Sequence, residues 1–159
     1  AMQTALVPIV GQCIGRKNFS DAKKFTKTFV LSGCVAFLVV DLLMLPLFPL
    51  GMKLFNPPAE IIPEIFKLVL IAVVMHCLVW SISFILPSAL RASGDSIFTT
   101  ATSLSTMWIV RIGLGYLLGL YFGLGLPGIF FAMTFEWGVR GVVFLLRFKS
   151  GKWQTKEVL

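Results

Sequence analysis

The chain has 159 residues, of which 57% are hydrophobic and only 13% are charged, and its mean hydropathy is +0.91. A soluble domain carries about 25% charged residues, so this composition excludes an ordinary soluble fold and predicts an all-α integral membrane protein. The net charge of +7 does not indicate nucleic-acid binding, because the basic residues lie at the ends of apolar segments, as residues that orient membrane spans do.

The first apolar segment, residues 1–15, is too short to cross a bilayer. At 1.5 Å per residue it reaches only about 22 Å. Its basic pair, Arg16 and Lys17, follows the apolar run, whereas a signal peptide carries its charge before that run. We interpret the segment as the second half of a helix whose first half is missing, which makes the chain a fragment.

Four longer segments are predicted to span the membrane: residues 28–50, 65–90, 97–122 and 126–147. The connections between them alternate in basic content. Ten Lys and Arg residues lie on one side (five in the loop 16–27, Arg91, and four in the tail from Arg147), against Lys53 and Lys67 on the other. The positive-inside rule therefore predicts a multi-pass protein of the plasma membrane whose loop 16–27 and tail are cytoplasmic.

The stretch FILPSALRASGDS (residues 84–96) separates the second and third full spans. Pro87 removes a backbone hydrogen bond and predicts a kink. Gly94 suits the end of a helix, because it adopts positive φ at little cost. Asp95 or Ser96 is a candidate N-cap for the next span. The stretch is predicted to be a tight cytoplasmic turn, and NPPAE (56–60) an external one.

The same stretch carries a family resemblance, which three further stretches share in the expected order. LPSALRASGDS resembles the end of the tenth helix of the multidrug and toxic compound extrusion (MATE) family. The other three resemble the end of its eighth helix, its eleventh helix and its twelfth helix: LVPIVGQCIGRKNFSDAKK, MWIVRIGLGYLLG and GIFFAMTFEWGVRGVVFLLRFKSGKW.

The resemblance implies the carboxy-terminal lobe of a two-lobed, twelve-helix antiporter, with its amino-terminal lobe and the first helix of this lobe absent. Such a protein expels amphipathic, often cationic compounds in exchange for Na⁺ or H⁺, and needs no other cofactor. Its partners would be those substrates, membrane lipid and the missing lobe. Several branches of the family carry an ion-binding acid in the tenth helix, but the matching region here holds Trp80 and Ser81 and no acid, so that site does not carry over.

Five ionisable residues lie away from the ends of the predicted spans, where a charge costs several kcal/mol unless it is paired or hydrated: Asp41, His76, Arg111, Glu136 and Arg140. Counted from the cytoplasmic ends, the first four lie within about 5 Å of one level, near the midplane, and Arg140 lies nearer the cytoplasm. The last two spans form a hairpin that turns near residues 123 and 124, so partners at one depth have numbers that sum to about 247. Arg111 and Glu136 meet this condition, which predicts an ion pair.

Several alternatives remain open for these residues. The set Arg111, Glu136 and Arg140 either links two helices, or Glu136 titrates or meets substrate, or the set pairs with the missing lobe. His76 is either a hydrogen-bonded packing residue or a proton relay. Asp41, which has no obvious partner in its own helix, is either a structural acid or a cavity-lining one. Soft and aromatic side chains that suit promiscuous ligands, or that face lipid instead, are Met75, Trp80, Phe84 and Met107.

No enzymatic or metal site is predicted. The spans hold no paired carboxylates and no nucleophile–base set, and Cys13, Cys34 and Cys77 lack metal-ligand spacing, so we interpret them as free thiols. The leading hypothesis is a multidrug efflux antiporter for xenobiotics. The alternatives are a flippase for lipid-linked precursors, or a membrane scaffold without transport activity. We expect the chain alone not to transport, because alternating access needs two lobes.

Overall fold

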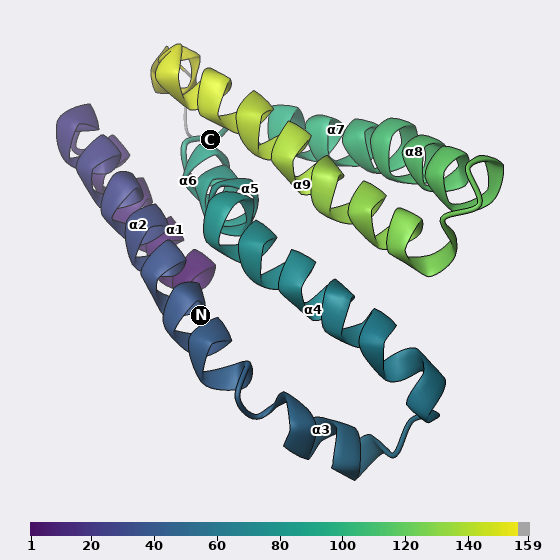
Figure 1. The fold of residues 1–159 in the computed structure, drawn as a ribbon. Helices are drawn as coiled ribbons and strands as arrows, with labels where there is room; N and C mark the ends of the chain where they lie inside the picture. The colour runs from purple at the N-terminus through teal and green to yellow at the C-terminus, as the bar shows by residue number, and fades with distance from the viewer. Residues whose placement is uncertain (156–159) are drawn as a thin grey trace.

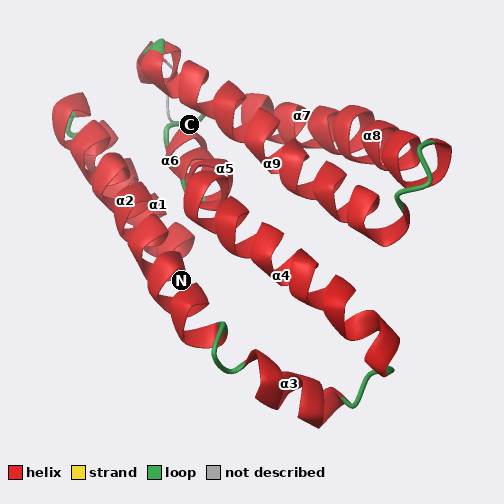
Figure 2. Cartoon of the chain, in the orientation of Figure 1, coloured by secondary structure: helices red, strands yellow, loops and turns green. Residues whose placement is uncertain are grey.

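The computed structural model describes residues 1–155, without the side chains of residues 77, 78 and 155, and this part of the chain consists of helices and turns with no strand (Figure 2). Three helical stretches are long and apolar enough to cross a membrane: Phe19–Met44, Ser96–Tyr121 and Gly125–Lys149. The all-helical class predicted from composition is therefore observed, and three of the four predicted spans correspond to a helical stretch of this kind. The segment predicted as the second span, 65–90, consists of several shorter helical pieces.

The α-helices follow one another along the chain (Figure 1) as α1 (Met2–Gly15), α2 (Phe19–Met44), α3 (Phe48–Phe55), α4 (Ile62–Met75), α5 (Ser81–Phe84), α6 (Leu86–Ala92), α7 (Ser96–Thr106), α8 (Gly113–Tyr116) and α9 (Gly125–Lys149). Short 3₁₀ turns lie at η1 (Ala59–Ile61) and η5 (Lys152–Thr155), and π-helical segments at η2 (His76–Trp80), η3 (Met107–Ile112) and η4 (Leu117–Tyr121).

The helix found in place of the first predicted span, 28–50, begins and ends earlier than predicted. α2 begins at Phe19, because the side chain of Asn18 accepts a hydrogen bond from the backbone N–H of Asp21 (3.2 Å) and so caps the helix. Most of the predicted loop 16–27 is consequently the first turns of α2. The helix ends at Met44, because the ring of Pro46 cannot continue it, and the short α3 follows with Pro49 in its first turn.

The second predicted span, 65–90, is one row of helical pieces rather than a single α-helix. It runs through α4, η2, α5 and α6, and the regular helix is interrupted at Ile85. Pro87 lies two residues later and has no N–H to bond to the carbonyl of Ser83, which is the physical reason for the break. The helix is therefore interrupted near Pro87, as the sequence predicts. The remaining spans, 97–122 and 126–147, agree with the structure to within two residues or so at each end.

The turn after α6 has the geometry that its glycine predicts. Gly94 has φ +85°, its N–H bonds the carbonyl of Arg91, and the N–H of Asp95 bonds the carbonyl of Leu90. Of the two predicted N-cap candidates, Asp95 occupies the N-cap position of α7 and Ser96 does not. The side chain of Asp95 makes no cap hydrogen bond. Its carboxylate is instead held by Arg147 in two hydrogen bonds, of 2.7 and 3.1 Å.

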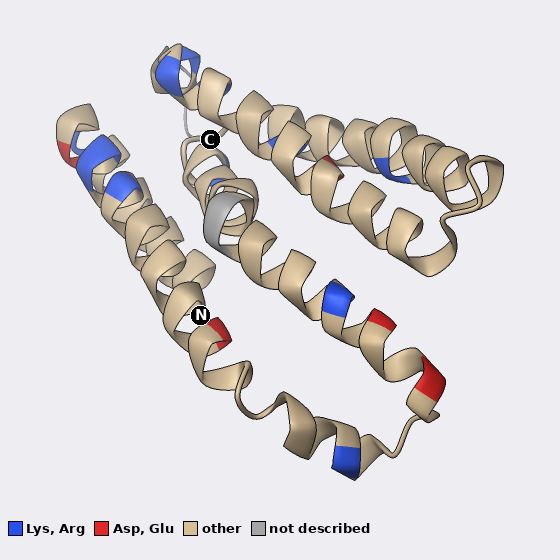
Figure 3. Cartoon of the chain, viewed as in Figure 1, with Lys and Arg blue, Asp and Glu red and all other residues tan. Residues whose placement is uncertain are grey.

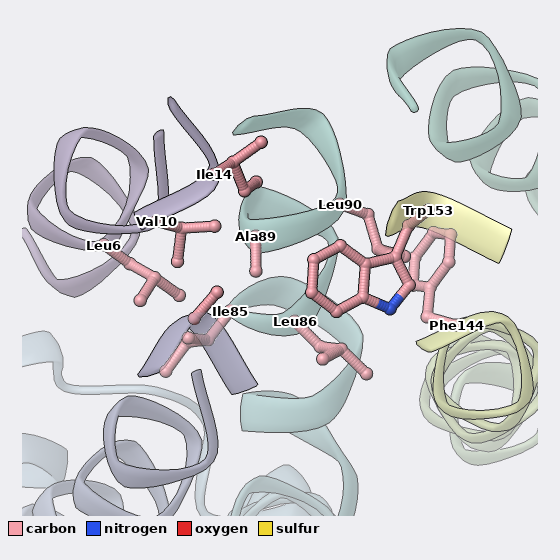
Figure 4. Packing of buried hydrophobic residues seen from close by; sticks show 10 residues of the cluster. Leu6, Val10, Ile14, Ile85, Leu86, Ala89, Leu90, Phe144 and Trp153 are labelled. Carbon is pink, nitrogen blue, oxygen red and sulfur yellow. The ribbon is translucent and has the colours of Figure 1, made fainter. Parts of the chain in front are cut away.

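The helices pack as a bundle in which α1 contacts α2 and α6, and α9 contacts the row from α4 to α8. Toward α3 the lines of α2 and α4 diverge (Figure 1). A buried apolar cluster (Figure 4) joins α1, α6 and α9 at the other end of the bundle and consists of Leu6, Val10, Ile14, Ala22, Ile85, Leu86, Ala89, Leu90, Phe144 and Trp153. This cluster holds α1, α2, α6 and α9 together at the end where α2 begins and α9 ends.

Most other large apolar side chains point outward. Leu54, Ile97 and Leu120 are 81%, 85% and 70% exposed, and all three belong to helices. Exposed apolar surface on this scale is unfavourable in water and is what a lipid environment accommodates. The arrangement agrees with a protein whose helices meet lipid or further helices around their circumference.

Candidate intramembrane charge and aromatic site

Glu136 lies in the middle of α9, and its side chain is completely buried. Both carboxylate oxygens have partners: Oε2 accepts a hydrogen bond from Nη2 of Arg111 (2.7 Å), and Oε1 accepts one from the hydroxyl of Thr106 (2.8 Å). Arg140 lies one turn later on the same helix, with its Nε 3.6 Å from Oε1. The structure therefore brings together the three charged residues that the sequence grouped, and it adds Thr106, which the sequence analysis missed.

This network has more positive than negative charge. Two guanidinium groups face one carboxylate, and the described residues provide no hydrogen-bond acceptor for Nε of Arg111 or for Nε and Nη2 of Arg140. The guanidinium of Arg140 lies 4.5 Å from the ring centre of Phe84, a cation–π contact that offsets part of its desolvation. A second negatively charged group would balance the two guanidinium groups.

Asp41 and His76 form a second polar contact inside the bundle. Nδ1 of His76 lies 3.5 Å from Oδ1 of Asp41, and the two side chains are 26% and 13% exposed. The other carboxylate oxygen of Asp41, Oδ2, is buried and finds no hydrogen-bond partner in the described part of the chain. Asp41 has no partner in its own helix, and His76 from the neighbouring span takes that role.

His76 also belongs to a closed series of five contacts between neighbouring aromatic rings. Phe37 lies 5.2 Å from His76 and 4.2 Å from Trp80, measured between ring centres. Trp80 stacks on Phe84 at 4.8 Å, Phe84 meets the edge of Trp137 at 5.6 Å, and Trp137 stacks on His76 at 6.2 Å. The five rings come from α2, η2, α5 and α9.

Two π-helical segments place much of this site. His76 and Trp80 begin and end η2, while Met107 and Arg111 lie in η3. A π-helical segment holds extra chain per turn and therefore rotates the residues after it about the helix axis. Such segments inside α-helices occur frequently at functional sites. Here the two segments lie where His76 contacts Asp41 of α2 and Arg111 contacts Glu136 of α9.

The four residues predicted to line a drug pocket do not line one cavity together. Trp80 and Phe37 border a hollow of about 410 Å³ between the start of α1, α2 and η2. Met75 faces a separate groove of about 520 Å³ beside α9. Phe84 lies under Arg140, and Met107 is half-buried at the start of η3. Trp80 and Phe84 belong to the closed series of aromatic contacts; Met75 and Met107 are not part of it.

A signal for the Asp41–His76 contact was present in the sequence. Their numbers sum to 117, so they are equidistant from a turn between residues 58 and 59, inside the NPPAE stretch. The register argument that pairs Arg111 with Glu136 therefore also pairs Asp41 with His76. Phe37 lies one turn before Asp41, and Trp137 directly follows Glu136, so their distance along the chain places both aromatic residues near the charged groups.

The remaining candidate ligands give no metal site. Cys13 and Cys34 are free thiols, whereas the side chain of Cys77 lies outside the described residues. Within the described ranges, no group of three or more His, Cys, Asp or Glu side chains is arranged to hold a metal ion.

Comparisons with known proteins agree on one family. The family model described as MatE matches residues 1–117. A probable multidrug resistance protein NorM of Thermotoga maritima is 27% identical over 150 residues, which cover 92% of this chain and 32% of the relative. A second protein of that name, from Oceanobacillus iheyensis, is 28% identical over 117 residues, 74% of this chain and 26% of the relative.

An uncharacterized transporter, YisQ of Bacillus subtilis, is 34% identical over 76 residues, which cover 48% of this chain and 17% of the relative. The chain thus spans a third or less of the length of the curated relatives that it matches. No solved structure gives a significant match.

Proposed function

Because the chain belongs to the MatE family, whose members are transporters and not enzymes, we propose that it forms part of an exporter of amphipathic, cationic compounds driven by a gradient of Na⁺ or H⁺. Two relatives named as probable multidrug resistance proteins support this class of substrate. The order of the four sequence motifs supports a place in the carboxy-terminal lobe. Since the chain spans only part of its relatives, the activity proposed is that of the complete protein.

The observation that carries the proposal is the arrangement around Asp41. A half-buried carboxylate with one unpaired oxygen contacts His76, whose imidazole in turn contacts the aromatic rings of Phe37 and Trp137. An organic cation gains from both groups, because aromatic faces attract cations and a desolvated carboxylate attracts them more strongly. The nearby hollow beside Phe37 and Trp80, of about 410 Å³, is within the usual size range of ligand sites.

Exchange follows from the single negative charge of this carboxylate. Asp41 can neutralise one cation at a time, whether that cation is the substrate, Na⁺ or a proton. Entry of the coupling ion from outside would therefore release the substrate, and departure of the ion on the inside would prepare the site for the next substrate. His76, whose Nδ1 lies 3.5 Å from Oδ1 of Asp41, is the neighbouring polar group at this position. A two-lobed protein converts this competition into directional transport.

The network of Arg111, Glu136 and Arg140 serves a different purpose in this proposal. Both oxygens of Glu136 already accept hydrogen bonds, and the side chain is completely buried, so it offers no free acceptor to a substrate. The network instead joins η3 to α9 and keeps the last two spans in register.

The proposal is tested with the complete transporter in drug-sensitive bacterial cells. We expect ethidium efflux that stops when the Na⁺ and H⁺ gradients are both collapsed, and an Asp41→Asn variant whose efflux falls at least about tenfold. Asp21→Asn, which changes an exposed acid on the same helix, is the matched control and should leave efflux unchanged. Efflux that persists without either gradient, or in the Asp41→Asn variant, would contradict the proposal.

A flippase for lipid-linked precursors is the second candidate, and the excess positive charge of Arg111 and Arg140 favours it. An anionic headgroup would complete that network. Under this alternative, Arg140→Gln abolishes translocation of a lipid-linked substrate while ethidium efflux is absent from the unmodified protein. Absence of both activities in the complete protein would favour a scaffold without transport activity.

A further inference from the structure

A groove with a basic rim lies where α2 begins and α9 ends. Three lysines, Lys23, Lys27 and Lys149, border it, and its volume is about 410 Å³. Its walls are apolar: Val30 from α2, Ile82 and Leu86 from the middle row, and Leu145 and Phe148 from α9. Figure 3 shows that basic residues gather on both helices at this end of the bundle.

The spacing of residues along α2 and α9 explains why lysines and apolar side chains both line the groove and why they lie at different depths in it. Lys23, Lys27 and Val30 are four and three residues apart, so they share one face of α2. Leu145, Phe148 and Lys149 share one face of α9 in the same way. On each helix the lysines lie nearer the end of the bundle, and the apolar residues lie deeper along the helix axis.

Within residues 1–155, none of the three lysines forms an ion pair, since the four ion pairs there join other residues. Two of the described acids lie near this end of the bundle: Asp21 accepts a hydrogen bond from the side chain of Asn18 (2.7 Å), and Asp95 is held by Arg147. The rim therefore carries three positive charges that a ligand with negative charge would neutralise.

The groove is held open by the residues at its end. The indole of Trp153 stacks on Phe148 with ring centres 5.2 Å apart, and its N–H donates to the carbonyl of Phe148 (2.9 Å). The same indole meets Phe19, the first residue of α2, edge-on at 6.1 Å. Trp153 is only 2% exposed, so it fixes the first turn of α2 against the end of α9.

We propose that this groove binds an anionic phospholipid, a role that is independent of the proposed transport activity. The ammonium groups of Lys23, Lys27 and Lys149 hold the phosphate of the headgroup, and an acyl chain lies along Val30, Ile82 and Leu145. A basic pocket between spanning helices at the cytoplasmic surface is the geometry that recognises such headgroups. The apolar walls below the lysines favour a lipid over a soluble anion, and the three positive charges disfavour a cationic substrate.

The test measures lipid binding by the complete protein in detergent, with native mass spectrometry and thermal unfolding as readouts. We expect phosphatidylglycerol to bind and to raise the melting temperature more than phosphatidylcholine does. Each lysine near the membrane surface contributes about fivefold to binding of an anionic lipid, so Lys23→Gln, Lys27→Gln and Lys149→Gln together should weaken phosphatidylglycerol binding about a hundredfold. Lys24→Gln, an exposed neighbour that does not line the groove, is the matched control and should bind as the unmodified protein does.

Two further arms separate a lipid from other occupants. Val30→Trp keeps all three lysines and fills the apolar part of the groove, so it should lower phosphatidylglycerol affinity while the protein still unfolds cooperatively. Glycerol phosphate, which lacks acyl chains, should give no thermal shift at millimolar concentration. The proposal is overturned if the unmodified protein does not prefer phosphatidylglycerol, if the triple variant binds it normally, or if Lys24→Gln is equally damaging. Equal shifts with glycerol phosphate would assign the rim to a soluble anion instead.

Discussion

Glu136 illustrates how a carboxylate is kept inside an apolar helix. Its two oxygens are occupied by Arg111 and Thr106, so the cost of removing it from water is offset by charge-assisted hydrogen bonds. Asp41 is in the opposite position, with one oxygen bonded weakly to His76 and the other unpaired. A carboxylate whose two oxygens both have hydrogen-bond partners is suited to a structural role, whereas one with an unpaired oxygen is suited to binding a ligand.

The first prediction concerns Arg111 and Glu136. Removing one partner of a buried pair leaves an uncompensated charge and costs about 3–5 kcal/mol, whereas neutralising both costs less. We therefore expect Arg111→Gln or Glu136→Gln to lower the yield of monodisperse full-length protein, measured by fluorescence-detected size exclusion, and the double variant to recover part of it. Lys53→Gln, at an exposed site, is the control. Normal yields for both single variants would show that the pair has no structural role.

The second prediction concerns Asp95 and Arg147, which are joined by two hydrogen bonds and tie the turn before α7 to the end of α9. Hydrogen bonds to charged groups contribute about 1.5–3 kcal/mol, so Asp95→Ala or Arg147→Ala should lower the melting temperature by several degrees. Ser96→Ala should have little effect, since Ser96 is exposed and is not the N-cap residue. A large loss in Ser96→Ala with none in Arg147→Ala would mean that capping dominates at this turn.

At the scale of elements, small residues decide how closely the last two spans approach. A Cβ added at Gly128 would lie 3.0 Å from the backbone C and O of Leu118 and 2.8 Å from the Cβ of Leu124. Close backbone contact of this kind is how spanning helices associate without a hydrophobic driving force. The hairpin of η4 and α9 therefore depends on the absence of a side chain at this position.

The third prediction follows from that contact. Gly128→Ala should destabilise the hairpin by about 1–3 kcal/mol, because backbone atoms must move to admit the methyl group. Gly113→Ala is a matched control, since a Cβ there meets nothing within 4 Å and a helical alanine is favoured over glycine by about 0.5–1 kcal/mol. Thermal unfolding should therefore shift in opposite directions for the two variants. Equal shifts would refute close packing at Gly128.

At the scale of the whole molecule, the ends of the bundle differ in charge. The start of α2 and the end of α9 lie at one end of the bundle, where basic residues gather, and α3, which contains Lys53, lies at the opposite end (Figures 1 and 3). The positive-inside rule assigns the more basic end to the cytoplasm. The structure thus places the basic segments together, and the direction across the membrane stays a prediction.

The fourth prediction tests that direction. Ser20→Cys and Ala59→Cys introduce thiols at exposed positions near opposite ends of the bundle. In intact cells we expect a membrane-impermeant maleimide to label the thiol at position 59 and to spare the one at position 20 until the cells are opened. Labelling of position 20 from outside would reverse the orientation, and it would also move the proposed lipid groove to the outer leaflet.

The class of the protein, the approximate spans, the register of Arg111 with Glu136 and the family are all predictable from the sequence. These features depend on local quantities, namely hydropathy over about 20 residues, turn residues such as Gly94, and distance along the chain from a turn. The register argument succeeds for the last hairpin because its two spans run side by side from one tight turn. The sequence also contains the helix-capping potential of Asn18, although the basic run after it is typical of a loop.

The tertiary structure alone decided which side chain meets which across the bundle. Asp95 could cap α7 or pair with Arg147, and only the position of α9 selects the second. The aromatic contacts of His76 and the groove between α2 and α9 likewise combine residues from three or more elements. Rotation of each helix about its axis sets these contacts, and the π-helical segments η2 and η3 shift that rotation by about 100° per extra residue. Composition and spacing do not record such a shift, because it results from packing against neighbouring helices.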